Sequence, residues 1–235
     1  MNKTILVTGG TKGIGRSIIE LFAQSGFNII TCSRNEDELE SLRNDVLNKN
    51  SHVLIYTKKV DLSIKKDIEN FVHYIDGLNL KIDILVNNAG QFIPGQIHTE
   101  EEGRLEHLIK VNLYSAYYIS KAILPQMIAR KSGHLFNICS TASITPYING
   151  GSYCISKFAL LGMTKVLREE MKNFGIKVTA VLPGATYTDS WSGVDIPPER
   201  FMPSDAIAES IYSIYHLKGA TNVEEILIRP QLGDI

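Results

Sequence analysis

A tyrosine and a lysine four residues apart have the clearest chemical potential in the sequence. Tyr153 and Lys157 fall in a stretch of helical periodicity, so both side chains would project from one face of a helix. A free phenol has a pKa near ~10 and is a poor proton donor at neutral pH. An ammonium group nearby would favour the phenolate and lower that pKa. The pair predicts a tyrosine tuned for proton transfer, although an isolated pair at this spacing is typical of a helix surface.

A glycine-rich stretch, TGGTKGIGRS at Thr8–Ser17, directly follows the first apolar run. An ATP-type phosphate loop would need a lysine where this chain has Arg16, and arginine is a poor substitute for that point charge. In the alternative pattern, T-G-x-x-x-G-x-G, Gly9 makes the turn and Gly13 lets the backbone approach a pyrophosphate. Gly15 then lets the following helix pack closely on the sheet. These ten residues alone also permit a glycine turn without any ligand.

Short apolar runs alternate with longer amphipathic stretches along the chain. The predicted strands are Thr4–Thr8, Asn28–Ser33, His52–Lys59, Ile82–Asn87, His134–Cys139, Lys177–Leu182 and Glu225–Arg229. The predicted helices span about 13–25, 36–49, 64–76, 101–130, 152–173 and 204–216. Strands that are apolar throughout are typical of a parallel sheet buried on both faces. The alternation predicts an α/β protein: a single-domain Rossmann fold, with a doubly wound seven-stranded parallel sheet and helices on both faces.

One segment interrupts this alternation. Residues 183–203 contain four prolines, two glycines and the only tryptophan, with no apolar period. A stretch of this length without regular structure is more often a functional lid than a linker. We therefore expect a lid at about 185–203 within one domain that spans residues 1–235.

Composition excludes several classes of function. The chain has 235 residues and a formal net charge of −1, which gives no reason to expect binding to nucleic acid or to an anionic membrane. No apolar run reaches the ~18–20 residues that cross a bilayer, and no secretory leader is recognisable, so a cytoplasmic protein is expected. The cysteines are odd in number and lack C-x-x-C spacing: Cys32, Cys139 and Cys154. They predict neither disulfides nor a metal site, and buried thiols are expected.

Taken in order, these motifs resemble the short-chain dehydrogenase/reductase family over nearly the full length of the chain. The matching motifs are the T-G-x-x-x-G-x-G turn, Asp61-Leu62, Asn87-Asn88-Ala89-Gly90, Asn112, Ser140, Tyr153-x-x-x-Lys157, and Pro183-Gly184 with Thr188. The resemblance implies that the phosphates at the glycine turn belong to a dinucleotide.

The resemblance also implies a role for each catalytic residue. Tyr153 would be the general acid, and Lys157 would tune it and bind the nicotinamide ribose. Ser140 would donate to the substrate carbonyl oxygen, where negative charge grows as hydride arrives. Asn112 would hold a water that links Lys157 to solvent. The cofactor-binding residues are predicted to be Gly9, Thr11, Lys12, Gly13, Ile14, Gly15, Ser33, Arg34, Asp61, Leu62, Asn88, Ala89, Gly90, Tyr153, Lys157, Pro183, Gly184, Thr186 and Thr188.

The end of the second predicted strand bears on the choice of nicotinamide cofactor. Sites that prefer NAD place an acid there for the ribose 2′-hydroxyl, but this strand ends in Ser33-Arg34. Arg34 can pair with a 2′-phosphate, Ser33 can donate to it, and Lys12 adds a second cation. The alternative is that both cations are simply solvated. We predict NADPH as the cofactor and reduction of a ketone or aldehyde to an alcohol.

The predicted substrate pocket is rich in aromatic side chains. Its expected wall is Gln91, Phe92, Ile93, Thr141, Tyr147, Tyr187 and Trp191. This wall favours a flat or bulky carbonyl substrate. The residues 187–191 and the chain's ending resemble the bacterial sepiapterin-reductase-type subgroup. For a pterin ring, Asp189 and Asp195 are the candidate anchors.

Other functions remain open at this point. A 3-oxoacyl-acyl-carrier-protein reductase would need a basic docking patch, to which Arg104, Lys110, Lys121, Arg130 and Lys131 could contribute. A non-catalytic NADP(H)-binding sensor would keep the fold without the chemistry, yet the serine, tyrosine and lysine are all present. Family members pair two long helices, here about 101–130 and 152–173, across a two-fold axis. A homodimer or homotetramer is therefore expected.

Overall fold

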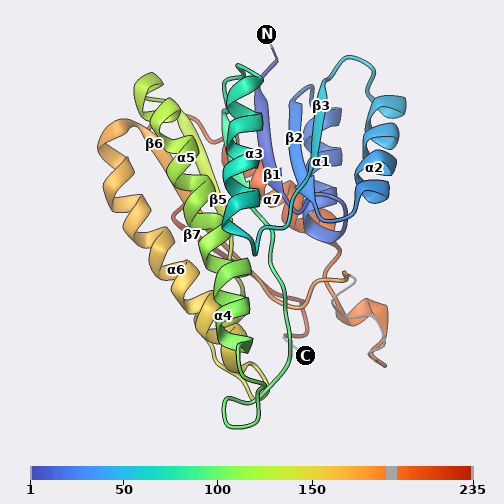
Figure 1. Ribbon diagram of the computed structural model, residues 1–235, viewed down its shortest axis with the longest axis vertical. Coiled ribbons are helices and arrows are strands. Elements are labelled where there is room, and N and C mark those ends of the chain that lie inside the picture. Colours follow the sequence, from blue (N-terminus) through green and yellow to red (C-terminus); the bar gives the residue numbers. More distant parts are fainter. Residues whose placement is uncertain (1, 189–194, 234–235) are drawn as a thin grey trace.

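Seven parallel strands form one sheet at the centre of the computed structural model, which describes residues 2–188 and 195–233 (Figure 1). The strands are β1 (Thr4–Thr8), β2 (Asn28–Ser33), β3 (Ile55–Lys59), β4 (Ile84–Asn87), β5 (Gly133–Ile138), β6 (Ile176–Pro183) and β7 (Glu225–Ile228). Their order in the sheet is β3-β2-β1-β4-β5-β6-β7, and every neighbouring pair is parallel. The predicted doubly wound, seven-stranded fold is confirmed.

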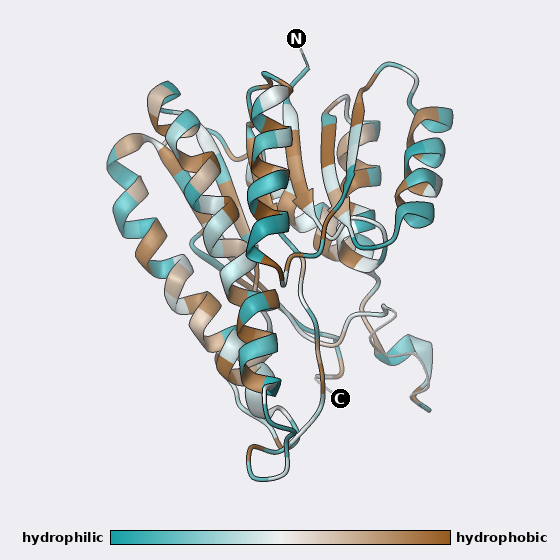
Figure 2. Ribbon diagram, in the orientation of Figure 1, coloured by the Kyte–Doolittle hydropathy of each residue, from teal (hydrophilic) through white to brown (hydrophobic). Residues whose placement is uncertain are grey.

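The central strands are buried because both faces of the sheet are covered. In β1, Ile5 and Val7 point into one hydrophobic cluster while Leu6, between them, points into the other. Side chains alternate between the faces of a strand, so a strand buried on both sides must be apolar at every position. Figure 2 shows the resulting hydrophobic strands between helices that carry hydrophilic residues on their outer surfaces.

Helices cover the two faces in two groups. The helices are α1 (Gly13–Gln24), α2 (Glu36–Lys49), α3 (Lys65–Gly77), α4 (Arg104–Ile109), α5 (Ser115–Arg130), α6 (Gly151–Met171) and α7 (Ser204–Tyr215). Side chains of α1, α2 and α7, such as Phe22 and Ile207, belong to one cluster. Side chains of α3, α5 and α6, such as Phe71 and Ile119, belong to the other. The two groups lie on opposite sides of the sheet in Figure 1.

The topology places the predicted site at the carboxyl edge of the sheet. Strand β1 lies between β2 and β4, so the chain order reverses there, and ligands of such folds bind at this switch point. Gly9 and Asn88 directly follow β1 and β4, and Ser140 lies two residues after the end of β5. Because all the strands are parallel, these residues emerge at the same edge.

Several predicted boundaries differ from the structure by one or two residues, and two differ by three. The helix expected at about 101–130 begins only at Arg104, because Gly103 has a φ of 83°, a left-handed conformation that cannot continue a helix. A five-residue π turn, Lys110–Tyr114, interrupts it between α4 and α5. The third strand begins at Ile55 rather than at His52, because the Leu54 N–H donates to the Asn28 side-chain oxygen at 3.0 Å and not to a backbone carbonyl of β2.

The two ends of the segment predicted as a lid are hydrogen-bonded to each other. A β-bridge joins Thr186 to Met202, and the Tyr187 N–H donates to the Met202 carbonyl at 2.8 Å. A short 3-10 turn, Pro198–Arg200, lies inside the segment. Across the part of the chain that the structure describes, none of the helices is long and apolar enough to span a bilayer.

Candidate active site

An open cleft of about 1370 Å³ runs along the carboxyl edge of the sheet. The predicted residues that line it are Gly9, Thr11, Lys12, Gly13, Ile14, Ser33, Arg34, Asp61, Leu62, Asn88, Ala89, Gly90, Gln91, Phe92, Ser140, Thr141, Tyr147, Tyr153, Lys157, Pro183, Gly184, Thr186 and Thr188. The fold thus gathers residues from the ends of six strands along one cavity. Gly15, Ile93, Asn112 and Tyr187 do not line it, while Trp191 and Asp189 lie outside the described residues.

The glycine turn after β1 has the geometry that its spacing predicted. Gly9 and Gly13 have φ values of +67° and +50°, which glycine adopts at little steric cost. A Cβ on Gly15 would lie 2.4 Å from the Gly9 carbonyl oxygen and 2.5 Å from the Asn88 amide nitrogen. Only glycine therefore allows α1 to start this close to β1 and β4.

The start of α1 is suited to an anion. Its N-cap residue, Lys12, makes no side-chain capping hydrogen bond, so the first backbone N–H groups of the helix have no side-chain acceptor there. Such a helix N-terminus attracts phosphate through its N–H groups and its dipole. Arg16 instead pairs with Glu20 at 2.9 Å and with Asp45 at 2.6 Å, away from the turn. This geometry fits a dinucleotide pyrophosphate and not an ATP-type phosphate loop.

Tyr153 lies in the first turn of α6 and faces Ser140 at the end of β5. Burial raises the pKa of Tyr153 to about 12, although the hydrogen bond from the Ser140 hydroxyl lowers it. The prediction that Lys157 lowers this pKa below its usual value was wrong for this structure. The Lys157 Nζ lies 5.8 Å from the Tyr153 ring centre, and the effect of burial on the pKa outweighs that of the Ser140 hydrogen bond. At neutral pH the phenol therefore keeps its proton.

Lys157 is buried beneath the cleft, one helical turn after Tyr153. Its Nζ donates to the Ile138 carbonyl at 2.8 Å, which anchors the amine against β5. Burial lowers the pKa of Lys157 to about 8. An ammonium has three donors, so this lysine can hold further acceptors in the cleft while it keeps its anchor.

Asn112 lies in the π turn and is buried behind the cleft wall. Its side-chain oxygen accepts from the Gln91 N–H at 2.7 Å, and its amide donates to the Gln91 carbonyl at 3.0 Å. The amide also donates to the Ser156 hydroxyl at 2.9 Å, on the helix that carries Tyr153 and Lys157. π turns occur often at functional sites. Here the turn fastens the loop after β4 to α6, and the water assigned to Asn112 stays a prediction.

The aromatic residues of the predicted pocket are divided between the cleft and its surroundings. The Phe92 ring packs edge-on against Tyr153, with ring centres 4.9 Å apart. Tyr147 also lines the cleft, and Ile148 beside it is 82% exposed. Tyr187 points elsewhere and packs against Phe201 at 5.8 Å. Of the predicted aromatic residues, Phe92 therefore contacts Tyr153, and Tyr147 lines the same cleft.

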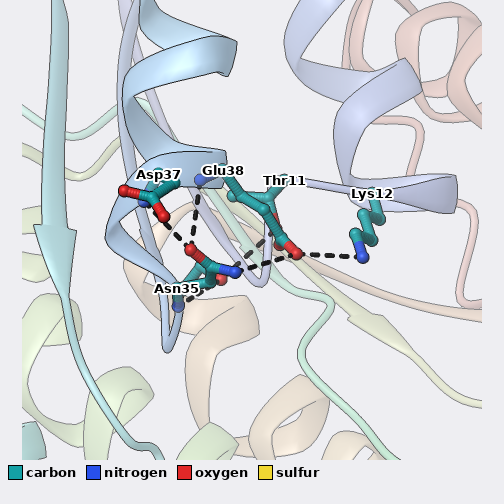
Figure 3. Close-up of polar contacts among 6 residues, drawn as sticks. Thr11, Lys12, Asn35, Asp37 and Glu38 are labelled. Atoms are coloured by element: carbon teal, nitrogen blue, oxygen red, sulfur yellow. Dashed lines mark hydrogen bonds and ion pairs between the residues drawn. The ribbon is translucent and has the colours of Figure 1, made fainter.

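Elsewhere in the cleft, a carboxylate that the sequence interpretation missed meets a predicted cation. The Lys12 Nζ lies 2.9 Å from Oε1 of Glu38, in the first turn of α2 (Figure 3). Arg34 is exposed and lines the same cleft. The sequence held a signal for this arrangement, because an Asn three residues before a Glu is typical of a helix N-terminus. Asn35 caps α2 by accepting from the Asp37 and Glu38 N–H groups.

The cysteines contribute no reactive thiol to this cleft. Cys32, Cys139 and Cys154 are all buried and unbridged. Burial raises the pKa of Cys32 to about 12 and that of Cys139 to about 11, so both stay protonated. Within residues 2–188 and 195–233, no group of three or more His, Cys, Asp or Glu side chains is placed to hold a metal ion.

Comparisons with known proteins agree with this geometry. A sepiapterin reductase from Chlorobaculum tepidum is 31% identical, and the match covers 100% of this chain and 99% of that protein. A metagenomic short-chain oxidoreductase solved in complex with NADP is 28% identical with a TM-score of 0.84, covering 97% of each chain. A short-chain dehydrogenase from Sphingobium yanoikuyae, solved with NADPH, is 26% identical with a TM-score of 0.84, covering 95% of this chain and 87% of the other.

The family model for short chain dehydrogenases matches residues 3–196, from the first strand into the segment after β6. That range includes the glycine turn, Ser140, Tyr153 and Lys157. The chain therefore belongs to the short-chain dehydrogenase family of oxidoreductases.

Proposed function

We propose that this protein is an NADPH-dependent reductase that converts a ketone or aldehyde carbonyl into an alcohol. The observation that carries the proposal is the open cleft, which joins an uncapped helix N-terminus at the glycine turn to Tyr153, Ser140 and Lys157. Two relatives above 25% identity were solved with NADP or NADPH, which supports this choice of cofactor.

The chemistry needs a hydride and a proton. The reduced nicotinamide, when bound, supplies the hydride to the carbonyl carbon. The Tyr153 hydroxyl donates its proton to the carbonyl oxygen, which becomes the alcohol oxygen. The pKa of about 12 keeps the phenol neutral, which is the form that donates, but it also makes the phenol a weaker acid, so donation depends on groups that stabilise the phenolate. The phenolate left behind is then stabilised by the Ser140 hydroxyl, whose hydrogen bond favours the ionised form.

Lys157 and Asn112 support this proton transfer in different ways. With a pKa of about 8, Lys157 is mostly protonated at pH 7. Its positive charge favours the phenolate that forms when Tyr153 gives up its proton, and its remaining donors suit the ribose hydroxyls of a nicotinamide cofactor. Asn112 is hydrogen-bonded to both the Gln91 backbone and Ser156, so it holds the loop after β4 against α6. We assign it a positioning role.

The aromatic wall points to the class of substrate. Phe92 and Tyr147 border the cleft beside Tyr153 and favour a flat carbonyl compound, such as a pterin side-chain ketone or a diketone. The identity to a sepiapterin reductase supports the same class. The acyl-carrier alternative has less support, because Arg104 pairs with Glu101 at 3.1 Å and Arg130 donates to the Ile82 carbonyl at 2.7 Å. Both cations are thus engaged within the chain.

Loss of NADPH absorbance in the presence of a panel of carbonyl compounds tests this function. The panel comprises sepiapterin, diketones, quinones and acetoacetyl thioesters, and the matched control is Tyr153→Phe. We expect turnover of at least one flat carbonyl by the wild type and a loss of ~10²–10⁴-fold in the variant, with NADPH binding retained. Tight NADPH binding without any turnover would favour the non-catalytic sensor, and turnover of thioesters alone would favour the acyl-carrier reductase.

We also propose that the protein forms a homodimer or homotetramer through α5 and α6. Ile155, Phe158 and Val166 are 40%, 44% and 56% exposed, and their spacing places them on one face of α6. Tyr117 on α5 is 46% exposed. Apolar side chains in such numbers on neighbouring helices are typical of a subunit interface. Light scattering of the wild type and of Phe158→Glu tests this proposal, with a smaller assembly expected for the variant.

A further inference from the structure

Glu38 contacts three residues where the glycine turn meets the start of α2. Its Oε2 accepts from the Thr11 hydroxyl at 3.0 Å, in the glycine turn. Its Oε1 lies 2.9 Å from the Lys12 Nζ and accepts from the Asn35 amide at 3.3 Å. Figure 3 shows this carboxylate between the turn and the start of α2. Glu38 is therefore the shared partner of these three residues.

The carboxylate is also within reach of the cleft itself. The Glu38 side chain is only 29% exposed, against 54% for Lys12, and both line the cavity together with Ser33 and Arg34. The Ser33 hydroxyl lies 3.2 Å from the Thr11 hydroxyl, which donates to Glu38. Of the residues assigned to a 2′-phosphate from the sequence, Lys12 thus contacts an acid directly and Ser33 is linked to it through Thr11. That acid comes from α2 and not from the position directly after β2.

We propose that Glu38 is a specificity-determining residue that restrains the preference for NADPH over NADH. The inference rests on the proposed function, which places the adenosine ribose in this part of the cleft. A 2′-phosphate that approaches Lys12 must compete with a carboxylate already bound to it, and the two anions repel each other. A 2′-hydroxyl carries no charge and can donate to the same carboxylate. Arg34, which is exposed and lines the same cleft, is the second cation for the phosphate, and its charge also acts on Asp61.

Binding of the two cofactors to Glu38→Gln tests the proposal. The amide keeps the shape of the side chain and one acceptor oxygen, but it removes the charge. We expect NADPH to bind about tenfold more tightly than to the wild type, and NADH to bind no more tightly. Dissociation constants from fluorescence titration at low ionic strength measure both effects, and the gain for NADPH should shrink as salt is added. The matched control is Glu36→Gln, because Glu36 is exposed in the same turn of α2.

A double-mutant cycle adds a second measurement. In the wild type, Lys12 already has a carboxylate partner, so Lys12→Gln should cost little NADPH affinity. In the Glu38→Gln background Lys12 no longer pairs with this carboxylate, and the same change should cost several-fold more. Equal costs in the two backgrounds would overturn the proposal.

The remaining outcomes are also decisive. Weaker binding of both cofactors to Glu38→Gln would mean that Glu38 only shapes the turn, and an equal gain in Glu36→Gln would mean a general field effect. Either result overturns the inference and leaves the proposed function intact. Failure of the wild type to bind NADPH at all would overturn the proposed function, and this inference with it.

Discussion

The Glu100 carboxylate accepts a hydrogen bond from the Ser152 backbone N–H at 2.9 Å, one residue before Tyr153. It also accepts from the Ser152 hydroxyl, and these bonds lower the pKa of Glu100. The same loop is joined to the chain before α6 by a bridge between Gly95 and Gly150. A carboxylate brought from a distant loop therefore caps the first turn of the catalytic helix.

We expect Glu100→Ala to lower both stability and turnover. Loss of a cap costs about 1 kcal/mol, and a small displacement of Tyr153 should lower kcat by about tenfold. Urea unfolding measures the first effect, and steady-state kinetics on a substrate from the carbonyl panel measures the second. Glu100→Gln keeps an acceptor oxygen and should recover most of the loss. An unchanged kcat in Glu100→Ala would show that the cap does not position Tyr153.

Lys157 should make the protein more stable as the pH rises above neutrality. Its pKa is about 8 in the folded protein, against 10.5 when exposed, so the unfolded chain binds more protons between these values. The free energy of unfolding must then increase with pH across this window, by about 2–3 kcal/mol between pH 8 and pH 10. Below about pH 7 both states are protonated, and Lys157 adds little pH dependence.

Lys157→Met isolates this effect, because methionine fills a similar space without a titrating group. Urea unfolding of both proteins from pH 7 to pH 10 should show that the free energy of unfolding of the wild type increases relative to that of the variant as the pH rises. Measurements stop at pH 10, since the raised pKa of Tyr153 lets the folded state hold its proton longer and reverses the slope above that value. Parallel profiles would mean that Lys157 is hydrated in the folded protein.

Sequence patterns predicted the sheet well because its strands obey a simple rule. Runs such as Ile5-Leu6-Val7 are apolar on both faces, and only a covered parallel sheet accommodates them. The motifs after each strand then had to converge at one edge. The π turn at Lys110–Tyr114 escaped prediction, because one local change of helical pitch leaves the apolar period almost unaltered.

Two features of the site depend on contacts that a pattern does not reveal. The pairing of Lys12 with Glu38 joins residues from separate elements. The sequence prediction for the region of Ser33-Arg34 included only the cations. The raised pKa of Tyr153 reflects how deeply α6 and β5 bury the phenol. Spacing identified the neighbours of this tyrosine, but the balance between burial and charge required the packed structure.

Gly15→Ala should damage both the fold and cofactor binding. The added Cβ would meet the Gly9 carbonyl oxygen at 2.4 Å and the Asn88 amide at 2.5 Å. That amide donates to the Thr8 and Gly9 carbonyls, so it cannot move away without breaking both bonds. We expect a loss of about 1–3 kcal/mol in the free energy of unfolding and weaker NADPH binding.

Gly77→Ala is the matched control, because Gly77 ends α3 and has no heavy atom within 4 Å of the added Cβ. This change should be neutral or stabilise the protein by up to ~1 kcal/mol. Thermal melting and fluorescence titration with NADPH compare the two variants. Equal stabilities would indicate that α1 can shift away from the sheet without cost.

His134 should make the protein sensitive to acid. It is buried in β5, stacks on Phe136 with ring centres 3.9 Å apart, and its Nε2 lies 2.9 Å from the Thr179 hydroxyl oxygen. Its Nδ1 has no hydrogen-bond partner among the described residues. Burial lowers the pKa of His134 from 6.5 to about 3. As the pH falls below 6.5, His134 therefore binds a proton in the unfolded chain but stays neutral in the folded protein.

The sign of the effect follows from this difference in proton binding. Stability due to a neutral His134 is complete above pH 6.5 and decreases by about 3 kcal/mol at pH 4.5. His134→Gln removes the titration and can keep a hydrogen bond to Thr179. Urea unfolding between pH 7 and pH 4.5 should therefore show a shallower loss for the variant, whatever its stability at pH 7. Equal slopes would mean that the imidazole accepts a proton within the fold, with solvent reaching Nδ1 between β5 and β6.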